Sequence, residues 1–154
     1  MDRPEPIPPL INVFAGNPLD RASERRDDAT WMAAQVAHAD ALTLICWQGD
    51  LLLETGPDGP RLAWLALGQA QTLSDMTAVF LGLWKTTPVF ALALEGATDP
   101  AAQGGPLAGL GRFSGLREAA ALLAPDEAAM AGTARSITEW HRRHGFCACC
   151  GAAS

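Results

Sequence analysis

Short apolar runs, separated by turns rich in glycine and proline, constrain the fold of this chain more than any other feature of its sequence. Runs of this length are typical of β-strands. The first two flank Gln48-Gly49, a pair that suits a two-residue hairpin turn. The segment 56–60 marks a further turn, and 73–83 fits a helix or a strand equally well. The sequence therefore predicts strands over 41–47, 50–54, 62–67 and 89–94.

Capping residues predict a helix before the first strand. Asp27 or Asp28 is placed to accept hydrogen bonds from the first free backbone N–H groups of a helix that ends near residue 39. Trp31, Val36 and the alanines of this segment would lie on its inner side.

Two more helices are expected after a loop over 96–111 that is rich in glycine and proline. Ser114 has the character of an N-cap for a short helix over 116–124. Pro125 suits the first turn of a longer helix that runs to about residue 144, with Gly145 following its end. The apolar face of this helix repeats every three or four residues, at Met130, Ala134, Ile137 and Trp140.

This order of elements predicts an α+β fold, a mainly antiparallel sheet with flanking helices. A chain of 154 residues accommodates one domain and a short appendage. We expect a Pro-rich segment over 1–12, the α+β domain over 13–124, a connecting helix over 125–145 and a cysteine-rich end over 146–154.

The charge balance argues against nucleic acid as a partner. The chain has 17 acidic and 11 basic residues, and its net charge of −6 repels phosphate backbones. Arg135, Arg142 and Arg143 are a candidate local basic cluster. No apolar stretch is long enough for a membrane helix, and the N-terminus has no signal-peptide pattern. We therefore expect a cytoplasmic protein that binds no membrane.

The clearest chemical motif is the C-x-x-C pair formed by Cys147 and Cys150. Two thiolates at this spacing bind one zinc ion from a tight turn, and a structural zinc site takes four ligands. The pair is half of such a site, and it directly follows the long helix. We take Cys147 and Cys150 as candidate zinc ligands. Cys46, inside an apolar run, is expected to be a small buried side chain.

Other interpretations of the cysteine-rich end stay open. The cysteines can form a reduced, flexible tail, or His141 and His144 can join them in a two-His, two-Cys site, although the order is the reverse of a zinc finger. Cys149 is an alternative to Cys150 as a ligand. A redox site is disfavoured, because the motif follows the C-terminus of a helix, where the dipole opposes a thiolate.

The remaining polar groups have structural interpretations. Asp20, Arg21, Arg25 and Arg26 form a cluster that we interpret as a solvated face or a structural salt-bridge corner in preference to a functional site. The sequence contains no P-loop, no G-x-S-x-G elbow and no H-E-x-x-H motif.

Several stretches together resemble the NADH pyrophosphatase family of zinc-ribbon Nudix hydrolases. The run from Glu139 to Gly151 (EWHRRHGFCACCG) is similar to that family's junction, W-H-x-x-H-x-F-C-x-x-C-G. Upstream, the run PLDR with Arg25-Arg26 resembles its N-terminal segment, and FLG at 80–82 with PVFAL at 88–92 resembles its core strands. Phe113, Leu116-Arg117 and Ala119 match the start of its late helices. The resemblance covers roughly 12–151.

The resemblance implies an N-terminal Nudix-like domain without catalytic residues, followed in the family by a four-cysteine zinc ribbon and a catalytic Nudix domain. The whole enzyme is typically a homodimer. It uses Mg²⁺ or Mn²⁺ to split NADH, NAD and NAD caps on RNA, giving nicotinamide mononucleotide and adenylate products. Cys147 and Cys150 would be the first two zinc ligands. The second C-x-x-C pair and the Nudix box, G-x5-E-x7-R-E-U-x-E-E-x-G-U, are not found in this sequence.

We therefore expect this chain to be the noncatalytic N-terminal part of a NAD(H) pyrophosphatase and to be inactive alone. The alternative is a stand-alone Nudix-like interaction module with a cysteine-rich tail.

Overall fold

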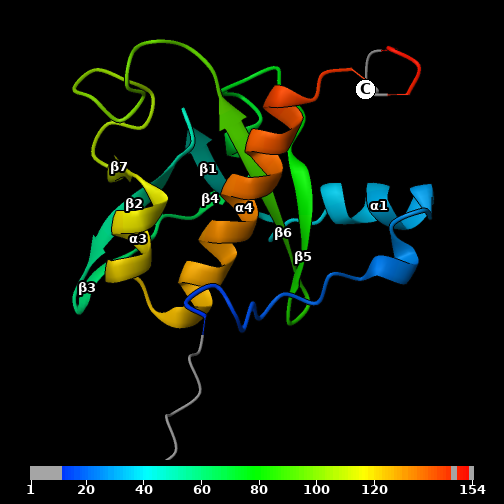
Figure 1. Ribbon diagram of the computed structural model, residues 1–154, viewed down its shortest axis with the longest axis horizontal. Helices are drawn as coiled ribbons and strands as arrows, with labels where there is room; N and C mark the ends of the chain where they lie inside the picture. Colours follow the sequence, from blue (N-terminus) through cyan, green and yellow to red (C-terminus); the bar gives the residue numbers. More distant parts are fainter. Residues whose placement is uncertain (1–11, 147–148, 153–154) are drawn as a thin grey trace, which may run out of the picture.

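A mixed β-sheet forms the centre of the computed structural model, which describes residues 12–146 and 149–152 (Figure 1). Seven strands lie in the described part of the chain: β1 Leu42–Trp47, β2 Asp50–Gly56, β3 Gly59–Leu62, β4 Leu65–Ala66, β5 Val79–Trp84, β6 Thr87–Leu94 and β7 Arg112–Ser114.

The main path of the sheet is β3-β2-β1-β6-β5, with β4 paired to β1 and β7 paired to β2. Strands β1 and β6 run parallel, and the other pairs in the described ranges are antiparallel. The α+β fold with a mainly antiparallel sheet is thus confirmed.

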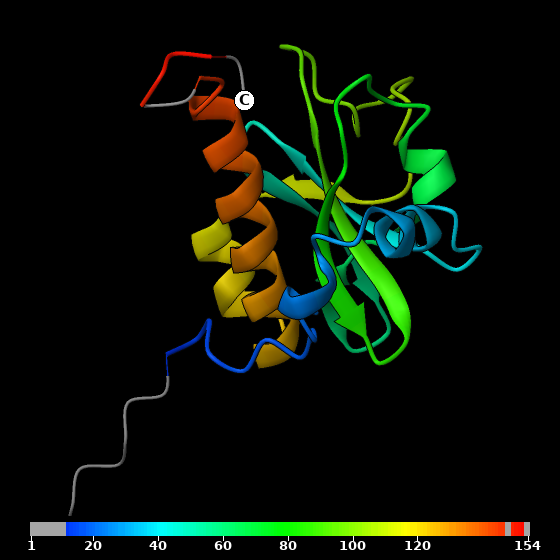
Figure 2. The same ribbon diagram turned by 90° about the vertical axis from the view of Figure 1, so that its right-hand side faces the viewer.

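Helices cover both faces of this sheet. Figure 2 shows α3 and α4 on one face, and α1, α2 and the long loop before β7 on the other. The helices are the 3-10 turn η1 Ser23–Arg25, α1 Ala29–Val36, α2 Leu67–Ala70, α3 Leu116–Leu122 and α4 Pro125–Arg143. No helix within 12–146 or 149–152 has the length and apolar character that a bilayer-spanning helix needs.

The continuous apolar runs of β1 and β6 follow from this covering of both faces. In β1, Leu44 and Cys46 pack in the cluster beneath α4, whereas Ile45 belongs to the cluster on the opposite face. In β6, Ala91 and Leu92 divide in the same way. A central strand with both faces buried needs apolar residues at every position, so the usual alternation of polar and apolar residues disappears.

Three local predictions from the sequence are confirmed. Asp28 caps α1, because its carboxylate accepts a hydrogen bond of 3.0 Å from the backbone N–H of Trp31. Pro125 stands in the first turn of α4. Gln48 and Gly49 both have positive φ, 51° and 87°, as the tightest hairpin turn between β1 and β2 requires.

The predicted inner side of α1 is partly wrong. Trp31 packs against the core, with its ring 5.6 Å from that of Phe80, but Val36 is 46% exposed. The helix ends at Val36 and does not reach residue 39, so this side chain stands on the last residue of the helix.

The predicted strand over 62–67 is also corrected. It is divided between the end of β3 at Leu62 and the two residues of β4, and Leu67 already begins α2. Leu62 pairs with β2, whereas Leu65 pairs with β1. The chain therefore changes partner strands at Ala63-Trp64, and a single straight strand could not pair with both.

Ser114 is not the N-cap of α3. It ends β7, a strand that the sequence did not indicate, and Gly115 takes the N-cap position without a side-chain hydrogen bond. The Ser114 hydroxyl instead donates to the Glu118 carboxylate at 2.7 Å. The short segment is a strand because β2 pairs with it.

Candidate functional site

Helix α4 is the element that joins the folded core to the cysteine-rich end. Met130, Ala131 and Ala134 are each 0% exposed in the cluster between the helix and the sheet. The Arg135 Nε donates to the carbonyl oxygen of Gly49 at 2.7 Å, which ties the helix to the β1–β2 turn. The helix is therefore anchored by apolar packing in its first half and by a side-chain hydrogen bond to a turn in its second half.

Cys46 lies beneath the second half of α4, and its thiol is not activated. Its side chain is buried, as expected. Burial raises the pKa of its thiol to about 11, and a hydrogen bond with Thr138 and the nearby charge of Arg135 oppose the shift only in part. A thiol with this pKa stays protonated at neutral pH, so Cys46 is neither a nucleophile nor a thiolate ligand.

Glu139 pairs with two arginines of the candidate basic cluster at the end of α4. Its carboxylate accepts hydrogen bonds from Arg142 and from Arg143, the latter at 2.9 Å. These bonds lower the pKa of Glu139. Arg135 faces the β1–β2 turn, whereas the Arg142 and Arg143 side chains are 56% and 65% exposed. The three- and four-residue spacing from Glu139 is the signal in the sequence that could have indicated this pairing.

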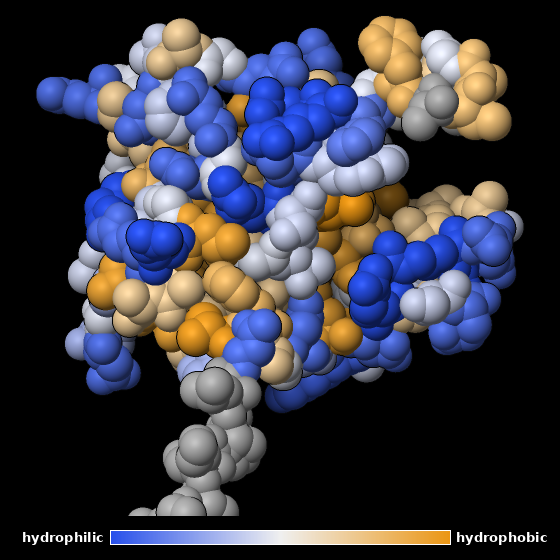
Figure 3. All heavy atoms as spheres, viewed as in Figure 1, coloured by the Kyte–Doolittle hydropathy of each residue, from blue (hydrophilic) through white to orange (hydrophobic). Residues whose placement is uncertain are grey.

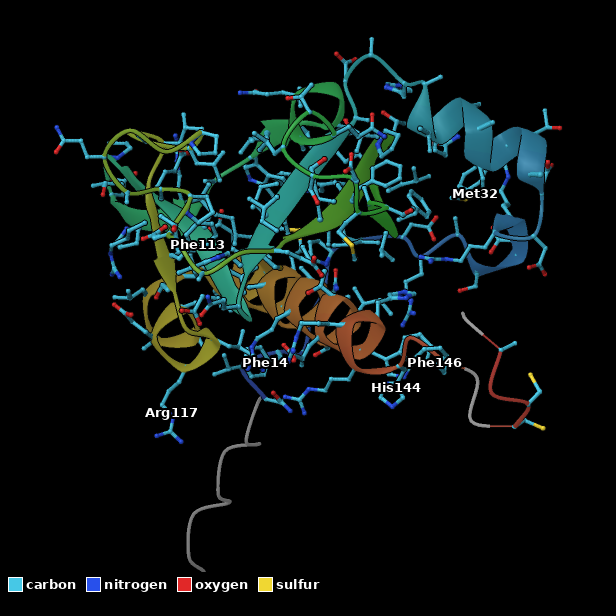
Figure 4. All side chains as sticks on the ribbon, turned by 90° about the horizontal axis from the view of Figure 1, so that it is seen from above. Phe14, Met32, Phe113, Arg117, His144 and Phe146 are labelled. Atoms are coloured by element: carbon cyan, nitrogen blue, oxygen red, sulfur yellow. The ribbon has the colours of Figure 1, made fainter. Side chains whose placement is uncertain are left out.

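Aromatic side chains are exposed where α4 ends. Trp140, predicted to lie on the apolar face, is 48% exposed, and Phe146 is 71% exposed. The His144 ring stacks on Trp140 at 5.1 Å, and the His141 ring meets it edge-on at 4.9 Å. Figure 4 shows His144 and Phe146 together at this end of the helix.

The structure describes only one of the two candidate zinc ligands. Cys147 lies outside the described residues, whereas Cys150 and its neighbour Cys149 are exposed and form no disulfide. Within the described ranges, no group of three or more His, Cys, Asp or Glu side chains is arranged to hold a metal ion. Zinc binding by Cys147 and Cys150 therefore stays a prediction, as does the alternative site with His141 and His144.

The polar cluster near the N-terminus covers the outer edge of β5. The Arg26 guanidinium donates to the carbonyl oxygens of Phe80 and Leu81, at 3.0 and 2.9 Å. Its Nε donates to the Arg21 carbonyl at 2.8 Å, and its charge lies 5.0 Å from the centre of the Phe80 ring. Desolvation by burial lowers the pKa of Arg26, and the charge of Arg21 adds to the shift.

Asp20 completes this edge through its backbone. Asp20 and Leu83 exchange two backbone hydrogen bonds, at 2.9 and 2.7 Å. Gly82 makes the approach possible, because a Cβ at this position would lie 2.5 Å from the carbonyl oxygen of Asp20. The cluster forms a structural corner, but the predicted salt bridges are not found among the described residues, and hydrogen bonds to backbone take their place. An unpaired strand edge can pair with the strand of another chain, and in this structure the N-terminal segment covers the edge of β5.

A groove of about 790 Å³ runs between α4 and this N-terminal segment, lined by Phe14, Arg21, Arg26, Gly132, Ile137 and Trp140 among others. The Phe14 ring packs on the helix at Gly132, where a Cβ would come within 2.9 Å of the ring. Figure 3 shows exposed apolar atoms in a hollow beside α4. An exposed apolar groove of this size is better suited to binding another polypeptide than to catalysing a reaction.

Comparison with known proteins agrees with this arrangement. No curated protein matches the chain. A family model described as the NADH pyrophosphatase-like rudimentary NUDIX domain matches residues 40–140, from the start of β1 almost to the end of α4. The matched segment is well over half of the chain and contains every strand described above. The chain belongs to the family of NADH pyrophosphatase-like rudimentary NUDIX domains.

Proposed function

We propose that this chain is the noncatalytic N-terminal domain of a NAD(H) pyrophosphatase, and that its task is to hold the zinc ribbon in a fixed place. The parent enzyme would cleave NADH, NAD or NAD caps on RNA, with Mg²⁺ or Mn²⁺ in a separate catalytic domain. The observation that carries the proposal is the continuity of α4, which is buried against the sheet as far as Thr138 and ends four residues before Cys147.

The anchoring of α4 supports a positioning role. A helix held by packing at Met130 and by the Arg135–Gly49 hydrogen bond cannot rotate without losing both contacts. The direction in which the tail leaves the domain is therefore set by the core. The exposed Trp140 and Phe146 beside the tail are suited to packing against a neighbouring module.

Cys147 and Cys150 would supply the first two zinc ligands. Cys150 is exposed and free of a disulfide, so its sulfur is accessible to a metal. Thiolates are the ligands that structural zinc prefers, and closed sites take four. Completion of the site by further ligands would convert the tail into a folded ribbon, because metal binding and folding are coupled in such modules.

Zinc retention tests the ligand assignment. The chain would be loaded with zinc, dialysed and analysed for metal by atomic emission. We expect Cys147→Ser and Cys150→Ser each to lower the retained zinc, whereas Cys149→Ser, the matched control one residue away, retains it. Loss in the control without loss in the other two variants would move the site to Cys149.

Hydrolysis of NADH tests the noncatalytic assignment. The purified chain would be incubated with NADH and Mg²⁺ or Mn²⁺, and the products separated by chromatography. We expect no nicotinamide mononucleotide above the enzyme-free background, because the sequence lacks the glutamates of a Nudix box. Product formation in proportion to the amount of chain would overturn the proposal.

The groove beside α4 favours a second candidate function, a stand-alone interaction module. Association of two copies through this face would also give the homodimer expected for the parent. Light scattering over a range of concentrations measures the mass directly, and a monomer at all concentrations would remove dimerisation from the role of this domain.

A further inference from the structure

The groove beside α4 lies against the first residues of the chain that the structure describes. Its lining follows the helix from Gly132 to His141, which at 1.5 Å per residue is about 14 Å. The Phe14 ring packs at Gly132, and Trp140 lines the groove near the other end of this stretch. Figure 4 shows Phe14 beside the middle of the helix. The groove therefore has an aromatic ring near each end of its helical wall.

This groove combines exposed apolar surface with unused hydrogen-bond donors. Phe14 is 40% exposed and Trp140 48%, and Ile137 between them along the helix is partly buried. The Trp140 indole N–H, the Ser136 hydroxyl and the Arg21 guanidinium line the groove and donate to no other described residue. Such a groove fits a segment that has apolar side chains and free carbonyl oxygens.

The charged groups that line the groove are positive. Arg21 and Arg26 contribute to the lining, and among the described residues no carboxylate does. Arg26 is bound to the carbonyl oxygens of β5, whereas Arg21 makes no ion pair within 12–146 or 149–152. The neighbouring Asp20 carboxylate accepts from the Ala22 N–H. A neutral or acidic segment therefore fits the groove better than a basic one.

The sequence of the chain itself contains a segment of this kind, residues 4–11, PEPIPPLI. Each residue in 3–9 is a proline or precedes one, and both positions favour the extended polyproline II conformation. This conformation has three residues per turn and no internal hydrogen bonds. Pro4, Ile7 and Leu10 would then lie on one face, with every carbonyl oxygen free. The charged residue of this segment is Glu5, an acidic one.

The attachment of this segment brings it to the groove. The described residues begin with a β-turn, in which the Ala15 N–H donates to the Asn12 carbonyl at 2.8 Å. A β-turn reverses the chain, so the stretches before and after it leave on the same side. The stretch after the turn carries Arg21 and forms a wall of the groove. At 3.1 Å per residue, five residues of polyproline II extend for about 15 Å, which matches the groove along α4.

A segment of the same chain has two advantages over a free partner. It is joined to the domain only two residues before Phe14, and a short connection gives an effective concentration on the order of millimolar. Its prolines also restrict it before it binds, so little conformational entropy is lost on docking. Aromatic grooves recognise proline-rich segments for this reason.

We propose that the groove beside α4 is the docking site of the chain's own segment 4–11, bound in the polyproline II conformation. Ile7 and Leu10 pack on the aromatic rings of the groove, and a carbonyl oxygen of the segment accepts from the Trp140 indole N–H. A partner that binds this face has to displace the segment. The inference concerns the groove and does not rest on the role of α4 in holding a zinc ribbon.

Nuclear Overhauser contacts in the full chain test the proposal. We expect contacts from the methyl groups of Ile7 and Leu10 to the rings of Phe14 and Trp140. A folded chain in which none of these contacts is present would overturn the proposal.

Matched variants test whether the apolar face of the segment makes the contact. Leu10→Ser should shift the indole signal of Trp140 and the amide signal of Ser136. Val13→Ser is the control and should leave both signals unchanged, because Val13 is apolar and 48% exposed but lies outside the groove. Unchanged signals in Leu10→Ser, or equal shifts in the two variants, would overturn the proposal.

Competition with a synthetic peptide of sequence PEPIPPLI measures the occupancy of the groove. A segment docked for about nine-tenths of the time reduces the affinity for the peptide about tenfold, so Leu10→Ser should bind the peptide about tenfold more tightly than the wild type. The same peptide with serine in place of both Ile7 and Leu10 is the control and should not bind. Equal affinity of the wild type and Leu10→Ser would show an empty groove and overturn the proposal.

A mixture of isotope-labelled and unlabelled chains distinguishes the two sources of the segment. Docking within one chain gives no contacts between labelled and unlabelled copies. Contacts between copies would assign the segment to a second copy and overturn docking within the chain. Leu10→Ser should retain as much zinc as the wild type, so a failure of the zinc assignment is a separate result.

Discussion

Arg26 binds two neighbouring carbonyl oxygens of β5, a task that depends on the planar fork of arginine. The cluster around it stood out in the sequence only as a group of charges. The sequence could not show which backbone groups would face those charges, because Phe80 lies 54 residues further along the chain. At the scale of single residues, a charged side chain stabilises this fold when it forms hydrogen bonds with the backbone at the edge of the sheet.

Arg26→Lys should therefore destabilise the fold although the charge is kept. Lysine cannot bind both carbonyls in the same geometry, and the loss of one charged hydrogen bond costs on the order of 1 kcal/mol. Urea denaturation measures the free energy of unfolding. Arg25→Lys is the control, because Arg25 lies over the Trp31 ring at 4.7 Å and donates to no carbonyl of β5. Equal losses in both variants would show that the edge contact contributes nothing.

Glu127 should make stability depend on pH. Burial raises the pKa of its carboxyl above the ordinary 4.5, and the hydrogen bond from the Leu62 N–H, at 3.3 Å, opposes the shift. The native state therefore holds this proton more tightly than the unfolded chain, so stability falls as the pH rises through the native pKa. Glu127→Gln keeps the acceptor and avoids the charge.

The free energy of unfolding of Glu127→Gln should exceed that of the wild type at pH 7, with a gap that narrows as the pH falls toward the ordinary carboxyl pKa. Thermal unfolding at several pH values measures this gap. Asp126→Asn removes a carboxylate from the same helix turn and should give no gain, because negative charge there suits the helix N-terminus. A gap independent of pH would contradict the explanation from burial.

At the scale of elements, local signals were sufficient where the chain pairs with its own neighbours. The Asp28 cap, the Gln48-Gly49 turn and the Pro125 helix start depend on a few adjacent residues, and each is found where the sequence placed it. Strand β7 depends on distant β2, and the parallel pairing of β1 with β6 joins segments that are separated in the chain by β2, β3, β4, α2 and β5. Such pairings have no local signature, so they could not be predicted.

In the candidate site, too, local features could be predicted from the sequence and contacts between distant segments could not. The helix before Cys147 was predictable from its spacing, whereas the Arg135–Gly49 hydrogen bond and the groove beside α4 were not. They depend on how α4 crosses the sheet. The exposure of Trp140 differs from the predicted apolar face for a related reason, because this last turn extends past the surface that covers Met130.

Gly82 is the element-scale feature most sensitive to change. Its φ of 156° and its contact with Asp20 leave no room for a Cβ, so Gly82→Ala should cost about 3 kcal/mol or more. Gly68→Ala is the control, since a Cβ there meets no atom within 4 Å and the residue lies in helix α2. Chemical denaturation should show a large loss for the first and little change for the second. Similar stabilities would mean that the N-terminal segment moves away without cost.

At the scale of the whole molecule, several exposed apolar side chains gather along α4. Trp140 and Phe146 lie at its end and Phe14 lies against its middle, as Figure 4 shows for the two phenylalanines. The cysteine-rich tail follows α4 in the chain. The distribution suits a domain that is covered on one side by a neighbouring module.

A hydrophobic fluorescent dye should therefore bind this chain, and Trp140→Ser should reduce the signal by removing the largest exposed ring beside the groove. Met76→Ser is the control, because Met76 is 39% exposed but lies outside that groove. Fluorescence titration measures both. An equal decrease in the two variants would show that the dye does not report on the face of α4.

The single helix from Pro125 to Arg143 also fixes an angle. Its 19 residues rise about 28 Å in all, and each residue turns the chain by about 100°. Loss of one residue after Ala134 would move the end of the helix by only about 1.5 Å but rotate it by about 100°, so that the chain would leave α4 in another direction. Loss of seven residues, close to two full turns, would nearly restore the direction at a shorter reach. The length of α4 therefore determines the direction in which the chain leaves the helix more strictly than it determines the distance. Shortening of α4 preserves that direction only when close to a whole number of turns is removed.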